Sequence, residues 1–180
     1  MNSNEPPQAR RRWQLALGDR GSGGLISLLG GSAAGPPPTV CSAGVDLVDV
    51  ARFRRAVDRS GEPLVRRVFT EPERAAVSTD PDRRVVELAA LFGVKESVVK
   101  AIGGMPRGGR YSDIQVEVGA GGSPQAVRLA GQLARWANGH RVELLAGSAP
   151  AGDELLLAWA LALTTVDAAV MDGRAKEATR

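Results

Sequence analysis

The segment Val85–Ile102 constrains the fold of this chain more than any other part of its sequence. Its spacing of apolar residues predicts a long helix, which Gly103 and Gly104 end. Apolar side chains cover most of the surface of this helix, namely Val85, Leu88, Leu91, Phe92, Val98, Val99 and Ile102. Any fold of the chain has to accommodate this helix together with the shorter segments on either side of it.

Those shorter segments predict both strands and helices. Strands are expected at Val40–Val50, which should be buried, Asp113–Val118, Ala126–Leu129, Val142–Leu145 and Leu155–Thr165, with a short extended piece at Arg66–Phe69. Helices are expected at Val50–Arg59 with Asp49 as its cap, from Thr70 onward with Glu73 completing a capping box, and at 129–137. Because helices and strands mix without a repeated strand–helix–strand order, we expect an α+β fold.

Composition divides the chain into a central domain and two tails. Residues 1–39 are rich in glycine, proline and arginine and have little apolar periodicity, so we expect a flexible low-complexity tail. Their apolar stretch at 25–29 is short for a secretory signal, and a start codon placed too far upstream is another explanation. Residues 172–180 should be a frayed polar end, which leaves 40–171 as the domain.

Composition also excludes several classes of protein. Aromatic residues make up 4% of the chain, which argues against a base-stacking RNA module. The lone Cys41 excludes an internal disulfide, and the single histidine, His140, excludes the usual zinc sites. A net charge of +3 makes a nucleic-acid binder remote. The sequence has no apolar run long enough to span a membrane, and we expect a cytoplasmic protein.

Arginine is concentrated between residues 52 and 84. Because arginine binds carboxylates and phosphates well, this stretch fits an acidic partner or a phosphorylated ligand. An ordinary solvated surface is the alternative, and the charge pattern alone favours it.

One stripe of the long helix differs from the rest of its surface. Ala89, Gly93, Glu96 and Lys100 follow one another at offsets of four, three and four, so they share a face. The two small residues beside a carboxylate and an ammonium predict space where another molecule can dock, and the glycines at 103 and 104 allow close approach to the backbone. The alternative is an ordinary exposed Glu–Lys pair, which is common on helices.

Asp46 lies in a strand that is otherwise apolar. A buried carboxylate without a partner costs several kcal/mol, so Asp46 needs a cation, a hydrogen-bond donor or a path to solvent. Arg52 is one candidate partner. A hard cation held by Asp46 and Glu96 together is the other, and Mg²⁺ suits two carboxylates and a phosphate.

Four blocks of this sequence, in order, resemble the holo-acyl-carrier-protein synthases, which are small members of the 4′-phosphopantetheinyl transferase superfamily. The first block is Gly44–Asp49 with Arg52 and Phe53, and the second is Arg67–Thr70 with Glu73. The third is similar to the superfamily signature F-x-x-K-E-[AS]-x-x-K-A, here Phe92 with Lys95–Ala101. The fourth is Asp113–Val116 with Gly122–Pro124. Each block alone is weak, but the ordered set is fairly specific.

The resemblance implies an enzyme that transfers the 4′-phosphopantetheine arm of coenzyme A to a serine of an apo acyl carrier protein and releases 3′,5′-ADP. By position, Asp46 and Glu96 would hold Mg²⁺ at the coenzyme A pyrophosphate, with Glu96 and Lys100 as catalytic residues. Lys95, Lys100, Gly103 and Gly104 would contact coenzyme A, and Arg52 would dock the acidic carrier protein. It also implies a small sheet with a long metal-site helix, a homotrimer, and a place in fatty-acid or polyketide biosynthesis.

Two features of these synthases are missing from this chain. Leu91 stands where they often carry an arginine for a coenzyme A phosphate, and Leu144–Pro150 has no histidine where they carry Ser-x-Ser-His. Other basic residues can substitute, among them Arg84, Arg107 and Arg110, and His140 is a further but remote candidate. The alternative function is therefore that of a degenerate, non-catalytic relative, which binds carrier proteins or a partner subunit.

Overall fold

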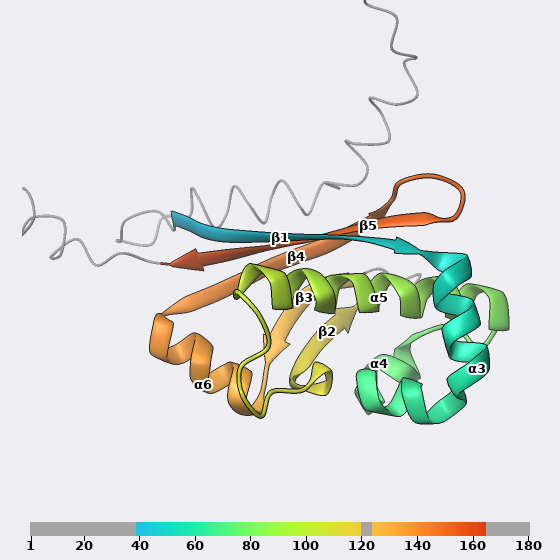
Figure 1. Cartoon of the computed structure of the whole chain (residues 1–180), viewed down its shortest axis with the longest axis horizontal. Coiled ribbons are helices and arrows are strands. Elements are labelled where there is room, and N and C mark those ends of the chain that lie inside the picture. Colours follow the sequence, from blue (N-terminus) through green and yellow to red (C-terminus); the bar gives the residue numbers. More distant parts are fainter. Residues whose placement is uncertain (1–38, 120–123, 165–180) are drawn as a thin grey trace, which may run out of the picture. The chain divides into compact units, whose positions relative to one another are not determined.

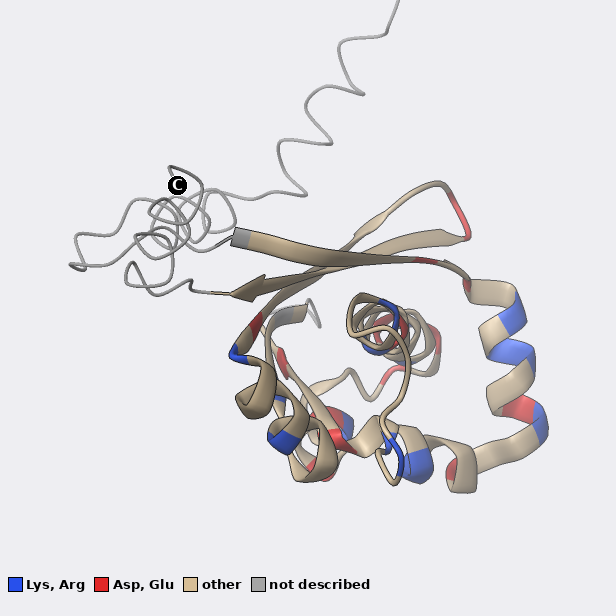
Figure 2. Ribbon diagram, turned by 60° about the vertical axis from the view of Figure 1, so that its left-hand side comes forward, with Lys and Arg blue, Asp and Glu red and all other residues tan. Residues whose placement is uncertain are grey.

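Helix α5 (Pro81–Ala101) is the central element of the fold, and the other elements surround it (Figure 2). It begins four residues before the predicted start because Asp80 caps it, with Asp80 Oδ1 accepting from the Arg83 amide at 2.9 Å, and because Pro81 suits its first turn. Twelve of its residues are buried, including members of every face. A helix that is enclosed over most of its surface has to be apolar on most sides, which explains its sequence.

The computed structural model describes residues 39–119 and 124–164, and Val40–Thr164 form one compact unit. Apart from Thr39, the predicted tails lie outside the described residues, as does the turn at 121–123. Within the described part, no helix combines the length and apolar character needed to cross a membrane. The architecture is α+β, as the sequence predicts.

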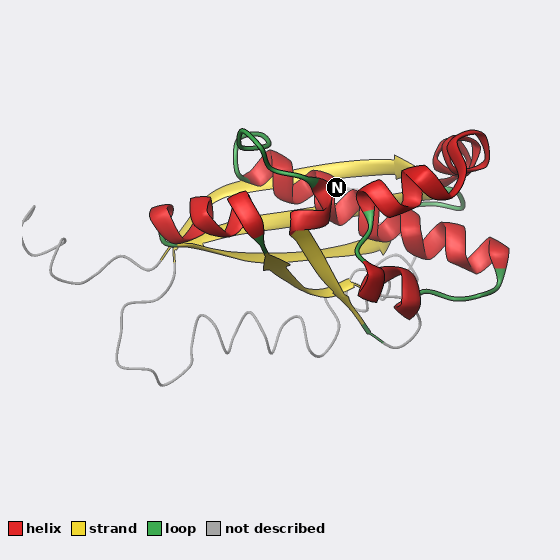
Figure 3. Ribbon diagram, turned by 90° about the horizontal axis from the view of Figure 1, so that it is seen from below, coloured by secondary structure: helices red, strands yellow, loops and turns green. Residues whose placement is uncertain are grey.

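A three-stranded sheet covers one side of α5 (Figure 1). Its order is β1 (Thr39–Asp49), β5 (Leu155–Thr164) and β4 (Val142–Pro150). Strands β4 and β5 are antiparallel, with Ser148 opposite Ala158. Strand β1 is antiparallel to β5. Cys41, near the start of β1, donates from its Sγ to the Ala162 carbonyl, and the amide of Val50, just after the end of β1, donates to the Glu154 carbonyl. Figure 3 shows the helices in front of these strands.

A second, two-stranded sheet packs on another side of α5. Strands β2 (Ile114–Val118) and β3 (Pro124–Leu129) form the predicted antiparallel hairpin, with Val116 opposite Val127. The short 3-10 helix η1 (Tyr111–Asp113) leads into β2, and helix α6 (Gly131–His140) follows β3. His140 lies beyond the helix predicted at 129–137, but it is the last residue of α6.

Helix α3 (Val50–Val68) includes three of the four residues of the predicted extended piece at Arg66–Phe69, so that prediction is wrong for them. Only Phe69 has an extended backbone. Asp49 caps α3 as predicted, accepting from the Arg52 amide at 2.8 Å. Gly61 leaves the helical conformation, with φ of 62°, but the chain resumes helix immediately after this kink. Helix α4 (Glu71–Ala76) begins with the predicted capping box of Thr70 and Glu73.

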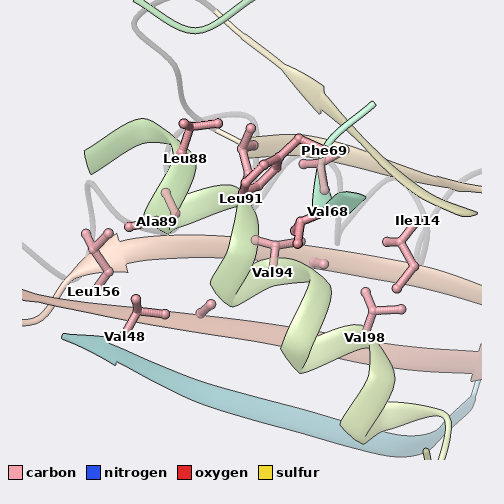
Figure 4. Close-up of a cluster of buried hydrophobic side chains, with 14 of the residues drawn as sticks. Val48, Val68, Phe69, Leu88, Ala89, Leu91, Val94, Val98, Ile114 and Leu156 are labelled. Carbon is pink, nitrogen blue, oxygen red and sulfur yellow. The ribbon is translucent and has the colours of Figure 1, made fainter. Parts of the chain in front are cut away.

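The stripe of small residues on α5 serves the packing of the core rather than a ligand. Ala89 is fully buried (Figure 4), and a Cβ atom at Gly93 would lie 2.8 Å from Val48 Cγ2 and 3.0 Å from Ala158 Cβ. Strands β1 and β5 therefore fill the space in which the sequence predicts a docked molecule. The prediction is wrong for Ala89 and Gly93, since strand packing explains small residues equally well.

Candidate active site

Gly44 brings strand β1 against the C-terminal half of α5. A Cβ atom at this position would lie 2.0 Å from the carbonyl oxygen of Ser97 and 2.6 Å from the amide of Ala101, so only glycine fits. Side chains alternate along a strand, and Asp46 therefore faces the same side as Gly44, toward α5. The close approach at Gly44 places the Asp46 carboxylate beside the last turn of the helix.

Lys100 joins the two elements at this point. Its ammonium nitrogen lies 2.7 Å from Asp46 Oδ1 and donates to the Val45 carbonyl at 2.9 Å. The partner of Asp46 is thus Lys100 and not Arg52, and the i,i+4 pair of Glu96 with Lys100 is not formed. Both side chains remain open to solvent, with 48% of Lys100 and 19% of Asp46 exposed.

Tyr111 binds the carboxylate of Glu96, the second acidic residue that the sequence predicts as a metal ligand. Tyr111 belongs to η1, and its hydroxyl donates to Glu96 Oε1 on α5 over a distance of 2.7 Å. Burial, then the hydrogen bond to Glu96 and the charges of Glu96 and Asp46, together raise the pKa of Tyr111 to about 12. The phenol is therefore a neutral donor at physiological pH, and both carboxylates are close enough to act on it.

In the cluster formed by Asp46, Glu96, Lys100 and Tyr111, the two carboxylates supply the kind of oxygen that a hard divalent cation prefers. Magnesium commonly takes one or two carboxylates and completes its octahedron with water and substrate phosphates. Within residues 39–119 and 124–164, no group of three or more histidine, cysteine or acidic side chains could form a closed metal cage. Two carboxylates beside an ammonium fit a metal that is shared with a phosphorylated substrate.

The chain after α5 leaves room next to this cluster. Gly103 and Gly104 adopt φ angles of 79° and 122°, and their amides close the helix by donating to the carbonyls of Lys100 and Val99. Apart from each glycine and its neighbours in the chain, no heavy atom of the described residues lies within 4 Å of a Cβ atom built at either position. Their backbone is therefore accessible to a ligand that reaches Lys100.

Comparison with known proteins identifies the family. The family model of the 4′-phosphopantetheinyl transferase superfamily matches residues 42–160, which include every member of the cluster. The chain belongs to this superfamily. Within it, the holo-[acyl-carrier-protein] synthase of Chloroflexus aggregans is 39% identical over 127 residues, covering 64% of this chain and 89% of that relative. The predicted relationship to holo-acyl-carrier-protein synthases is confirmed.

Solved structures of such synthases share the fold. The holo-ACP-synthase of Plasmodium yoelii aligns with a TM-score of 0.61 at 18% identity, over 72% of this chain and 98% of that one. The ACPS–CoA complex of Chronobacterium ammoniagenes aligns with a TM-score of 0.58 at 26% identity, over 69% of this chain and 97% of that one. The α+β fold of this chain is thus that of the transferase superfamily.

Lys95 of the transferase signature does not reach the cluster. Its ammonium is fully buried, 2.9 Å from Glu73 Oε2, and donates to the carbonyls of Tyr111 and Ile114. Burial lowers the pKa of Lys95, and the nearby Glu73 carboxylate opposes that effect. The structure gives no support to the predicted contact of Lys95 with coenzyme A, because every bond of its ammonium is internal.

The positions at which this chain departs from the pattern of the small synthases have other contacts within its own fold. Leu91 is fully buried in the core (Figure 4), and 144–150 lie in the middle and end of β4. His140 stacks on Trp136, with ring centroids 4.5 Å apart, and its Nδ1 is 2.7 Å from the Trp136 carbonyl oxygen. Arg84 donates to the carbonyls of Arg74 and Ser78, whereas Arg107 and Arg110 lie exposed in the segment between α5 and η1.

Sequence reasoning missed Tyr111 as a member of the cluster. Tyr111 is the only tyrosine of the chain and lies just before a predicted strand, but nothing in its local pattern indicates that it reaches Glu96. The second omission is the bond from Glu73 to Lys95, since the capping box explains Glu73 on local grounds alone.

Proposed function

We propose that this chain is an active holo-acyl-carrier-protein synthase, which transfers 4′-phosphopantetheine from coenzyme A to an apo acyl carrier protein and releases 3′,5′-ADP. The observation that carries the proposal is the meeting of Asp46 and Lys100, which lie 54 residues apart in sequence, beside Glu96. We place the enzyme in the cytoplasm and in fatty-acid or polyketide biosynthesis, on the strength of the resemblance to the small synthases.

The residues of the cluster have distinct roles in this proposal. Asp46 and Glu96 would hold Mg²⁺, which neutralises negative charge on the pyrophosphate when it is bound. The ammonium of Lys100 is exposed, so it can turn from Asp46 to a phosphate oxygen and stabilise the leaving 3′,5′-ADP. The accessible backbone of Gly103 and Gly104 allows the coenzyme to lie against the end of α5. Phosphoryl transfer depends mainly on such positioning and charge neutralisation.

Intact-protein mass spectrometry tests the function. An apo acyl carrier protein incubated with this chain, coenzyme A and Mg²⁺ should gain the mass of one phosphopantetheine, and EDTA should prevent the gain. If the folded protein modifies none of several carriers, the chain is a non-catalytic relative that binds carriers or a partner subunit.

We also propose that helix α3 docks the carrier protein through an exposed arginine stripe. Arg52, Arg55 and Arg59 are exposed and follow one another at offsets of three and four, so they share one face of α3. Other arginines between residues 52 and 84 form ion pairs within the domain, since Arg54 pairs with Asp82 and Arg74 pairs with Glu62. A basic face that begins three residues after the Asp49 cap suits an acidic partner whose serine must reach Asp46.

Replacing Arg52 by glutamate should raise KM for the carrier protein about tenfold, which corresponds to about 1.4 kcal/mol. The reversed charge repels an acidic carrier but lies outside the proposed coenzyme site, so KM for coenzyme A should change less than about twofold. Steady-state kinetics measures both constants. Arg135→Glu makes the same change of charge on α6 and is the matched control. Equal effects of Arg52→Glu on both constants would remove Arg52 from the docking surface.

The outer face of the three-stranded sheet supports a homotrimer, which the resemblance to small synthases suggests. Gly44 and Val48 face α5, and the alternate residues Val45 and Leu47 point outward with 55% and 57% exposure. Leu157, Trp159 and Leu161 lie on the same outer face of β5, opposite to the buried alanines 158, 160 and 162. An exposed apolar face of this kind is typical of an interface between subunits, and we propose that further copies of this chain cover it.

Replacing Val45 by aspartate should dissociate the trimer, because a carboxylate buried at an apolar interface costs several kcal/mol. Native mass spectrometry should then give the mass of one chain in place of three. Val86→Asp is the matched control, since Val86 is also exposed but belongs to helix α5 and not to a strand of the sheet. A trimer that survives Val45→Asp would show that the sheet face is not the interface.

A further inference from the structure

Tyr111 is held at three points, one of which is a proposed metal ligand. Its carbonyl oxygen accepts from the buried Lys95 ammonium at 3.0 Å, which fixes the main chain of η1. Its ring packs against Phe92, with centroids 6.2 Å apart. Its hydroxyl donates to Glu96 Oε1 at 2.7 Å. Both Phe92 and Glu96 lie on one face of α5, four residues apart, so the ring follows the helix surface to the carboxylate.

This arrangement restricts the carboxylate of Glu96. Glutamate has three side-chain torsions, and the carboxylate of Glu96 is only partly buried, so without a fixed partner it would adopt several orientations. The bond from Tyr111 selects the orientation in which Oε1 faces η1. Among the described residues, none donates a hydrogen bond to Oε2, which is therefore left for another ligand.

We propose that Tyr111 is a positioning residue, whose hydroxyl orients Glu96 so that its second oxygen is presented to a divalent cation beside Asp46 and Lys100. This inference rests on the proposed function, in which Glu96 is a metal ligand. Hydrogen bonds to the ligands of a metal fix their orientation and commonly change metal affinity by an order of magnitude or more.

The support for Tyr111 extends into the core of the domain. The Lys95 ammonium that holds its carbonyl is itself held by Glu73, and Glu73 Oε1 accepts from the Val116 amide at 2.7 Å. A chain of contacts thus runs from α4 through the buried pair to η1 and then to Glu96. Lys95 influences the site through the backbone of Tyr111, which gives the signature lysine a role without contact to coenzyme.

The test measures metal binding apart from activity. Mn²⁺ is titrated into the full chain without coenzyme A and free Mn²⁺ is followed by electron paramagnetic resonance, for the wild type and for Tyr111→Phe. The phenylalanine keeps the ring packing and removes only the hydroxyl. The expected result is a dissociation constant for Mn²⁺ raised about tenfold, and a similar rise in the Mg²⁺ concentration that gives half-maximal transfer. At saturating Mg²⁺, kcat should return to within about threefold of wild type, as expected of a residue that acts through another.

Two comparisons make the result decisive. Ser78→Ala removes a hydroxyl that accepts from the Asp80 amide at 3.1 Å near the other end of α5, and it should bind Mn²⁺ as the wild type does. Unchanged Mn²⁺ binding in Tyr111→Phe, or equal weakening in Ser78→Ala, would overturn the inference while the transferase function stands. A wild-type chain that neither binds Mn²⁺ nor transfers phosphopantetheine would overturn both.

Discussion

Replacing Lys95 by methionine is expected to destabilise the domain by about 3–5 kcal/mol. Lys95 and Glu73 form an ion pair that is closed to solvent, with exposures of 0% and 1%. Methionine has a similar shape but no charge, so the Glu73 carboxylate would stay buried without its cation. The carbonyls of Tyr111 and Ile114 would also lose their donor. Urea unfolding followed by circular dichroism measures the loss as a lower midpoint.

Lys100→Met is the matched control for this prediction, because it makes the same change on the same helix. Lys100 also pairs with a carboxylate, that of Asp46, but its side chain is half exposed, and such pairs contribute about 0–1 kcal/mol. The double variant Lys95→Met/Glu73→Gln should recover part of the loss, since no unpaired charge then remains buried. A Lys95→Met protein as stable as Lys100→Met would show that the buried pair does not stabilise the fold.

The sequence predicted features whose causes are local. The caps of α3 and α4 are confirmed because Asp49, Thr70 and Glu73 bond to amides within three residues of their own positions. The hairpin of β2 and β3 is confirmed for a similar reason, since a turn and two alternating segments define it. The wrong prediction at Arg66–Phe69 also has a local cause. Only Gly61 leaves the helical conformation, and the helix continues directly after it as far as Val68.

Contacts between distant segments could not be predicted in the same way. A lysine that follows an apolar run can be exposed or buried, and only the placement of Glu73, 22 residues earlier, decides that Lys95 is buried. The stripe of small residues likewise fits a ligand or a strand, and the answer depends on where β1 and β5 pack. For Asp46, the sequence left Arg52 and a metal open, and the structure adds Lys100 because Gly44 brings the strand onto the helix.

Neutralising either proposed metal ligand, by Asp46→Asn or Glu96→Gln, is expected to lower the rate of phosphopantetheine transfer by about a thousandfold or more, which corresponds to about 4 kcal/mol of transition-state stabilisation. Both amides keep the size of the native side chain. Asparagine can still accept from Lys100 and glutamine from Tyr111, so the hydrogen bonds at 2.7 Å can persist. The loss should therefore reflect charge and metal binding rather than a disturbed fold.

Measurements of stability and of metal affinity distinguish a loss of metal binding from a disturbed fold. Because Asp46 and Glu96 are both partly open to solvent, the urea midpoint of each variant should lie close to that of the wild type, while Mn²⁺ binding is lost. Glu143→Gln is the matched control, since Glu143 is exposed on β4 and bonds to no member of the cluster, and its transfer rate should be unchanged. Transfer by Glu96→Gln at the rate of Glu143→Gln would mean that Glu96 binds no metal, and would leave Asp46 and Lys100 to position coenzyme A on their own.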